Sequence, residues 1–108
     1  MNEQVKAGEV FRLSDLLSYE KGSVVNMDVA SNPNMKFVVM AFDAGTGLSE
    51  HSAPGDALIF ALEGEGEIVY EGTPHSLKAG DQFRMAKGGR HSVKANGQFK
   101  MALLLTLA

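Results

Sequence analysis

The sequence predicts an all-β protein whose short strands form a sandwich or barrel. Apolar or alternating segments follow one another from residue 23 to residue 107, and stretches rich in Gly, Asn, Asp or Pro separate them. The chain has 12 glycines in 108 residues, which supply the positive φ angles that tight hairpin turns require. Closely spaced short strands with such turn residues are typical of sandwiches and barrels.

The amino-terminal part carries the only helical signal. Residues 1–10 are polar and lack periodicity, so we expect them to fray or to lie along the surface. In LSDLLSYEKG, Ser14 is placed as an N-cap before a short apolar turn that Gly22 ends. A helix of about two turns is predicted here.

Nine strands are predicted after this helix. They cover residues 23–29, 35–42, 47–51, 56–63, 66–70, 75–78, 81–86, 91–95 and 98–107. Turn residues such as SNPN at 31–34 and NG at 96–97 separate them. No internal repeat divides the sequence, and its length suits a single domain over residues 1–108.

Some strands are apolar on both faces. In residues 56–63 one face carries Ala57, Ile59 and Ala61, and the other carries Leu58, Phe60 and Leu62. A strand that lines a barrel with one face needs a second sheet, the amino-terminal segment or a partner subunit to cover the other. We expect a homodimer, because a small chain has little left for cover; cover within the chain is the alternative.

Composition excludes several classes of partner. The net charge is −3 and the ten Lys and Arg residues are scattered, which argues against a nucleic-acid groove or an anionic membrane surface. The absence of cysteine excludes disulfides and thiolate zinc sites. No signal-peptide core is visible, and the longest apolar run, 101–105, is too short for a bilayer. We expect a cytoplasmic protein with a small-molecule ligand.

Two spaced motifs contain histidines. Intervals of five, one, three and six residues separate Gly45, His51, Ala53, Ala57 and Gly64. This spacing resembles the first motif of the cupin superfamily. Intervals of five, one, two and three residues separate Gly80, Ala86, Gly88, His91 and Ala95, which is similar to the second motif. The resemblance implies a cupin-like jelly roll, the double-stranded β-helix barrel, with a short amino-terminal helical turn.

The sequence departs from these motifs at two metal ligands. In the family, two histidines and a glutamate of the first motif and the histidine of the second hold the metal. Here His51 and His91 remain, whereas Ala53 and Ala57 occupy the other two positions. The neighbouring acidic residues at positions 50 and 56 are offset by one residue, which on a strand reverses the face unless a bulge intervenes.

Two imidazoles alone bind a divalent ion weakly, so Fe, Mn, Ni or Zn needs water, substrate or an unassigned carboxylate to complete its shell. By strand parity and the family's topology, one cavity is lined by His51, His91, Ala53, Ala57, Ile59, Ala61, Met85 and Val93. The alanines leave room for a ligand; alternatively, Met and Phe side chains fill the space as a closed core. His75 lies outside both motifs and is expected on the surface.

Three functions follow from this site. The first is a small-molecule-binding cupin with an apolar cavity, two inward histidines and a degenerate metal site. The alternative is a metal-dependent cupin enzyme, of dioxygenase or isomerase type, that uses His51, His91 and a further ligand. A metal-free enzyme with one of these histidines as general base remains a third possibility.

Overall fold

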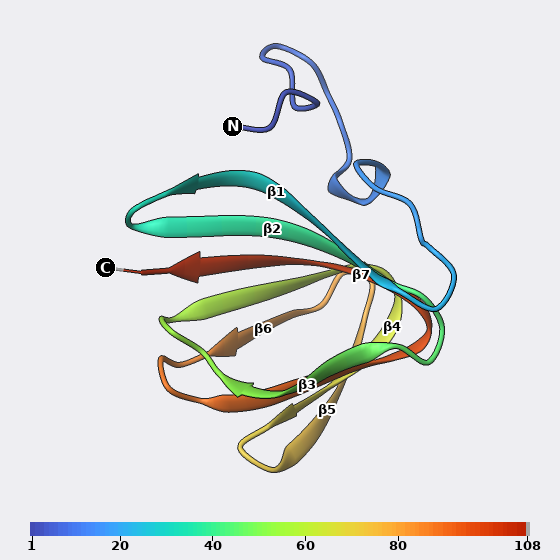
Figure 1. Ribbon diagram of the computed structural model, residues 1–108, viewed down its shortest axis with the longest axis vertical. Coiled ribbons are helices and arrows are strands. Elements are labelled where there is room, and N and C mark those ends of the chain that lie inside the picture. The colour runs from blue at the N-terminus through green and yellow to red at the C-terminus, as the bar shows by residue number, and fades with distance from the viewer. Residues whose placement is uncertain (108) are drawn as a thin grey trace.

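The computed structural model describes residues 1–107 and is built almost entirely from antiparallel strands (Figure 1). One turn of 3₁₀ helix comes first, and seven strands follow it. The elements are η1 (Leu13–Asp15), β1 (Val24–Asn32), β2 (Met35–Phe42), β3 (Gly47–Ser52), β4 (Ala57–Tyr70), β5 (Thr73–Lys78), β6 (Gln82–Met85) and β7 (Arg90–Thr106). The predicted all-β class with a short amino-terminal helical turn is confirmed.

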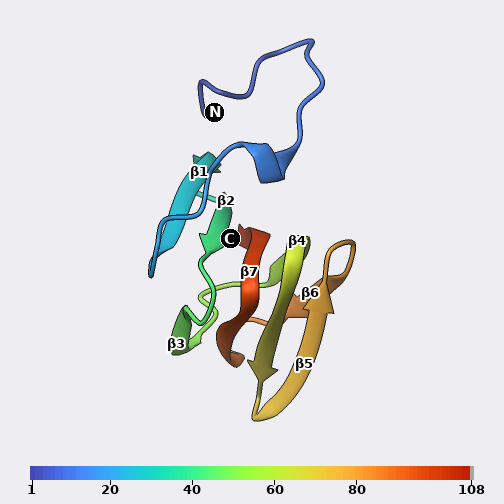
Figure 2. The ribbon, with the colours of Figure 1, turned by 90° about the vertical axis from the view of Figure 1, so that its right-hand side faces the viewer.

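Two long strands, β4 and β7, run through both sheets of the barrel. The second half of β7 lies between β2 and the first half of β4, with β1 and β6 outside them. The first half of β7 lies between β3 and the second half of β4, with β5 outside. The two sheets meet where the long strands bend and spread apart at the opposite end (Figures 1 and 2). This is the predicted jelly-roll arrangement.

The bends explain where the predicted strand boundaries were wrong. The sequence predicted breaks between 63 and 66 and between 95 and 98, but β4 and β7 continue through both points. Gly64 and Gly97 adopt φ angles of 74° and 76°, and the β4–β7 pairing shifts its register beside them. Because the two paired strands bulge at the same place, the ladder bends without ending.

The amino-terminal helix is shorter than predicted. Only three residues form a 3₁₀ turn, Arg12 occupies the N-cap position, and no side chain caps it. The prediction that Ser14 caps a two-turn helix was therefore wrong. Instead, Leu13, Leu16 and Leu17 pack on the outer face of the sheet, so tertiary packing holds the turn in place of capping.

The barrel has an inner and an outer apolar cluster. The inner cluster between the sheets includes Phe42, Ile59, Ile68, Phe99 and Met101, each at most 2% exposed. The outer cluster is formed where the amino-terminal segment lies on the other face, and its buried members are Leu17, Val29, Val39, Ala41 and Ala102. The second apolar face is thus covered in part by the chain itself. Within residues 1–107, no helix is long and apolar enough to cross a membrane.

Candidate ligand site

The two motif histidines lie side by side at the open end of the barrel. His51 of β3 is the direct register partner of His91 of β7, so both side chains project from the same face of the sheet. Their ring centroids are 4.1 Å apart, with an interplanar angle of 60°. His91 is only 5% exposed, whereas His51 is exposed. The pair therefore has one buried and one accessible imidazole.

Hydrogen bonds to the backbone orient both rings in the same way. Nδ1 of His51 lies 2.8 Å from the carbonyl oxygen of Ser49, and Nδ1 of His91 lies 3.2 Å from that of Gly89. A carbonyl oxygen only accepts, so each Nδ1 must carry the proton and donate it. In the neutral rings each Nε2 is then an unprotonated acceptor.

The environment of His91 favours its neutral form. Burial lowers the pKa of His91, the hydrogen bond to Gly89 partly offsets this, and the neighbouring His51 lowers the pKa further. A buried imidazole with a lowered pKa remains uncharged at neutral pH. Its Nε2 lone pair is consequently available to accept a hydrogen bond or bind a metal.

The histidine pair stands at the edge of a small apolar cavity of about 130 Å³. The cavity is lined by His51, Ala53, Pro54, Ala57, Met85, His91, Leu103 and Leu105. Because Ala53 and Ala57 end at Cβ, they leave this space open beside the rings. We refer to it below as the histidine cavity.

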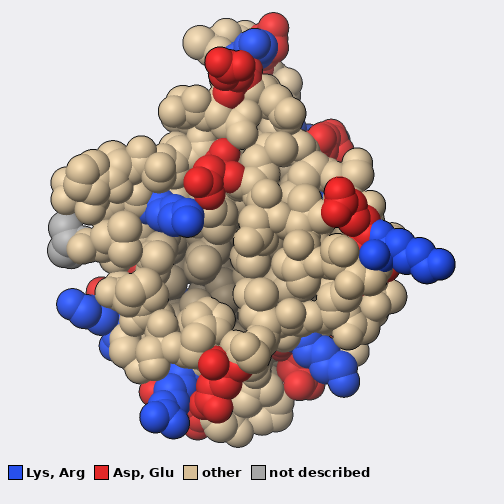
Figure 3. All heavy atoms as spheres, in the orientation of Figure 1, with Lys and Arg blue, Asp and Glu red and all other residues tan. Residues whose placement is uncertain are grey.

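A second hollow of about 230 Å³ adjoins the histidine cavity. The two share His51, Leu103 and Leu105, and the second is further lined by Asn26, Asp28, Lys36, Val38, Met40 and Leu48. Its rim carries the ion pair of Lys36 and Asp28, with 4.0 Å between nitrogen and oxygen. A hollow opens toward the viewer in the space-filling view, on the side where the sheets spread apart (Figure 3).

Five of the eight predicted site residues line the histidine cavity, and three do not. His51, His91, Ala53, Ala57 and Met85 line the histidine cavity. The other three, Ile59, Ala61 and Val93, lie in the inner core cluster, each less than 5% exposed. The same inner cluster contains the Met and Phe side chains Met40, Phe42, Phe99 and Met101.

Residues outside the cupin motifs complete the site. Leu103 and Leu105 come from the last strand, where alternation along the strand puts them on one face with Met101. The residues of β1 and β2, such as Asp28 and Lys36, precede the first motif and were not identified from the sequence. Identifying them would have required the pairing of β1 with β2, because this register places both side chains beside the second hollow.

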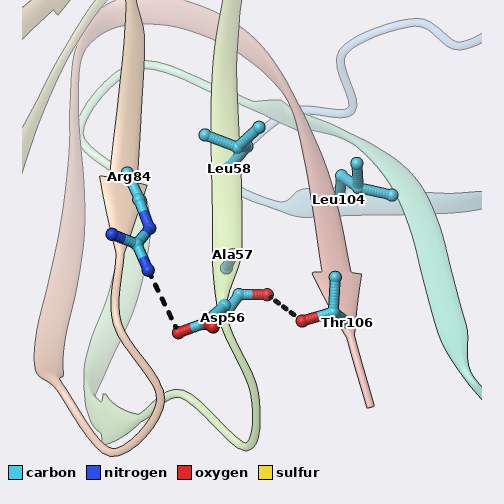
Figure 4. Close-up of a pocket in the computed structure, with 6 residues that line it drawn as sticks. All are labelled: Asp56, Ala57, Leu58, Arg84, Leu104 and Thr106. Atoms are coloured by element: carbon cyan, nitrogen blue, oxygen red, sulfur yellow. Dashed lines mark hydrogen bonds and ion pairs between the residues drawn. The ribbon is translucent and has the colours of Figure 1, made fainter. Parts of the chain in front are cut away.

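The acidic neighbours of the motif do not complete a metal shell. The Asp56 carboxylate accepts a hydrogen bond from the Lys87 amide and lies 3.6 Å from an Arg84 guanidinium nitrogen, on the outer side of the barrel (Figure 4). Glu50 lines another, open hollow together with His51, Ser52 and Arg90. Over residues 1–107, no group of three or more His, Cys, Asp or Glu side chains is placed to hold a metal ion. These residues do not fit a metal held by protein ligands alone.

His75 lies apart from this pair. It is half-buried on β5, with its ring centroid 4.8 Å from that of Phe83. The surface position expected from the sequence is thus only partly correct, because one side of the ring is covered.

Comparison with known proteins agrees with the fold. The family model described as the cupin domain matches residues 38–107. This chain therefore belongs to the cupin family. Comparison with curated proteins gave no match.

Solved structures give the same result. A cupin superfamily protein from Desulfitobacterium hafniense aligns with a TM-score of 0.92 and 22% identity, over 96% of this chain and 95% of the other. A cupin 2 conserved barrel domain protein from Leptotrichia buccalis aligns with a TM-score of 0.86 and 35% identity, over 89% of this chain and 47% of the other.

A variant of salicylate 1,2-dioxygenase from Pseudoaminobacter salicylatoxidans also aligns, with a TM-score of 0.68 and 20% identity. The match covers 75% of this chain and 24% of that enzyme. At this identity the similarity shows the fold alone.

Proposed function

We propose that this cupin binds a small organic molecule with an apolar body and one hydrogen-bond donor. The observation that carries the proposal is the orientation of His51 and His91, whose Nδ1 groups are both occupied by backbone carbonyls. Two Nε2 acceptors are thereby left beside an apolar cavity. A hydroxyl group entering the cavity can donate to one of them.

The walls of the cavity determine the rest of the ligand. Leu103, Leu105 and Met85 offer apolar surface, and burial of such surface is worth about 25 cal/mol per Å². A cavity of about 130 Å³ is smaller than the roughly 300–1,000 Å³ typical of drug-sized ligands. A single ring or short chain therefore suits it, and a longer ligand extends into the adjoining hollow.

The donor requirement supplies specificity. A ligand without a donor displaces water from the Nε2 of His91 and leaves this buried acceptor unpaired, which costs about 1–3 kcal/mol. A ligand that donates avoids this cost. The site should therefore discriminate strongly between ligands of the same shape that differ only in a hydroxyl hydrogen.

Phenol and anisole test this directly, because they share a ring but only phenol donates a hydrogen bond. Titration followed by NMR of the histidine ring nitrogens should show phenol binding at least about tenfold more tightly than anisole. His91→Phe should abolish the difference, His51→Ala should reduce it, and His75→Ala serves as the matched control. Equal binding of phenol and anisole, or shifts of the His75 signals only, contradicts the proposal.

A second candidate is a metal-dependent cupin enzyme of dioxygenase or isomerase type. The observation in its favour is that each Nδ1 donates to a carbonyl, the outer-shell arrangement usual for histidines that ligate a metal through Nε2. His51 and His91 then supply two ligands for Fe, Mn, Ni or Zn, and the substrate or a further carboxylate supplies the remainder. Elemental analysis of protein purified without added metal tests this candidate, and a content far below one equivalent contradicts it.

A further inference from the structure

An apolar pocket lies on the outer face of the sheet, on the opposite side from the histidine cavity. It has a volume of about 250 Å³ and is lined by Asp56, Ala57, Leu58, Arg84, Leu104 and Thr106. Leu58 and Leu104 are register partners on β4 and β7 and form its floor, while Arg84 and Asp56 stand at its rim (Figure 4). We call this site the outer pocket. Leu58 is 37% exposed there.

The amino-terminal segment leaves the outer pocket uncovered. Val5 and Leu13 both pack against the outer cluster, but every residue from 6 to 12 between them is exposed. Asn2 is also fixed, since its backbone amide donates to the Val29 carbonyl over 2.7 Å. Residues 6–12 therefore form a loop that is anchored at both ends and stands away from the sheets (Figures 1 and 2).

This loop presents two adjacent apolar side chains to solvent. Val10 is 102% exposed and Phe11 is 45% exposed. Burying these two side chains against a second apolar surface would remove their apolar area from water, which stabilises a contact. On either side of them in the sequence stand one acid, Glu9, and one base, Arg12, both exposed.

We propose that the loop of one chain docks into the outer pocket of a second copy, and that two chains exchange this contact about a twofold axis. Phe11 or Val10 covers Leu58 and Leu104 of the second copy. The rim charges Arg84 and Asp56 form an exposed ion pair, and the loop brings one acid, Glu9, and one base, Arg12, that can extend this pair into a network of alternating charges. Glu9 then faces Arg84 of the second copy.

The reciprocal arrangement explains both the exposed apolar side chains of the loop and the uncovered outer pocket with one contact. Each chain contributes one loop and one pocket, so a twofold dimer satisfies both loops and both pockets and leaves no site open for further growth. Because Asn2 and the η1 turn already hold the loop, docking costs less conformational entropy than it would for a free tail. The homodimer expected from the sequence thereby gains a defined surface.

The absence of cysteine in the chain permits a direct cross-linking test. Phe11→Cys protein is mixed with an affinity-tagged Leu58→Cys protein and oxidised gently, and non-reducing electrophoresis is used to detect disulfide-linked pairs. We expect a strong mixed species, since a disulfide requires Cα atoms within about 7 Å. Lys94→Cys, at an exposed position in the first half of β7, replaces Leu58→Cys in the matched control and should give little product.

Light scattering of the wild type completes the test. We expect twice the chain mass of 11.5 kDa. Phe11→Ser and Leu58→Asp should each shift the protein to the monomer mass while circular dichroism stays unchanged. A wild-type monomer at high concentration, or a dimer that both variants leave intact and that gives no Phe11–Leu58 cross-link, overturns the proposal.

Discussion

Tyr19 and Glu63 are joined by a hydrogen bond of 2.6 Å from the phenol hydroxyl to Oε1 of the carboxylate, across 44 positions of sequence. The ammonium of Lys100 lies 3.9 Å from the same carboxylate oxygen and 4.9 Å from the centre of the Tyr19 ring, and it donates to the Ser14 carbonyl over 2.6 Å. Burial, together with the Glu63 carboxylate, holds the pKa of Tyr19 far above its usual range. These contacts fix the amino-terminal segment to β4 and β7.

Lys100→Met should destabilise the protein, because Lys100 is only 7% exposed and its charge is paired within this cluster. Loss of a hydrogen bond to a charged group typically costs about 1.5–3 kcal/mol, and we expect a decrease of this size in the free energy of unfolding. Urea denaturation measures it. Lys94→Met, at an exposed position on the same strand, is the control, and equal effects of the two substitutions would contradict the role given to Lys100.

The buried histidine should make stability depend on pH. The pKa of His91 is lowered in the folded state, so below about pH 6.5 the unfolded chain binds a proton that folded His91 does not. The free energy of unfolding is therefore unaffected by the titration of this histidine above about pH 6.5 and decreases as the pH falls toward the pKa of His91 in the folded protein. Unfolding free energies measured from about pH 7.5 to about pH 5 should show a steeper fall for wild type than for His91→Phe. An unchanged slope in that variant would show that another group is responsible.

Gly64→Ala should be much more damaging than Gly97→Ala. Both glycines have positive φ angles, but a Cβ at Gly64 collides with the backbone carbonyl of Gln98, whereas one at Gly97 meets nothing within 4 Å. Gly97→Ala should cost about 1–2 kcal/mol from backbone strain alone. Gly64→Ala adds the collision to this strain, so we expect the Gly64→Ala protein to unfold at a clearly lower temperature than the Gly97→Ala protein. Similar midpoints for the two variants would disprove the tight approach at the bend.

The double substitution Ala53→His and Ala57→Glu should create a metal site. Both positions line the histidine cavity together with His51 and His91, so the variant places four ligating side chains around one space. We expect it to bind Zn²⁺ stoichiometrically and to unfold at a higher temperature with Zn²⁺ than with a chelator. The wild type is the control and should show little difference between the two conditions. A variant that folds but takes up no Zn²⁺ would show that the side chains do not converge.

Much of this architecture was predictable from local sequence. The hairpin turn at Glu71-Gly72, with φ angles of 48° and 80°, follows from Gly72, which tolerates positive φ, whereas Glu71 does not favour it. The bends at Gly64 and Gly97 were read as turns because local sequence does not distinguish a glycine that reverses the chain from one that forms a bulge. That distinction depends on which strand lies opposite.

The candidate site was predictable only where a motif covered it. His51, His91, Ala53 and Ala57 were identified by spacing, and they lie together. Strand parity also placed Ile59, Ala61 and Val93 on this face; they lie in the inner cluster and do not line the histidine cavity, because parity determines which face a side chain is on but not its position along the barrel. Lys36 and Asp28 were missed because their position depends on how β1 and β2 pair with the rest of the sheet.

The passage of β4 and β7 through both sheets also determines how the molecule comes apart. Neither sheet has a complete set of strands of its own, so one cannot melt while the other survives. Opening at the bend breaks the ladders on both sides of it, and amide hydrogen exchange along these two strands should therefore report a single global event rather than two independent ones. The candidate site and its scaffold should therefore exchange together, as one cooperative unit.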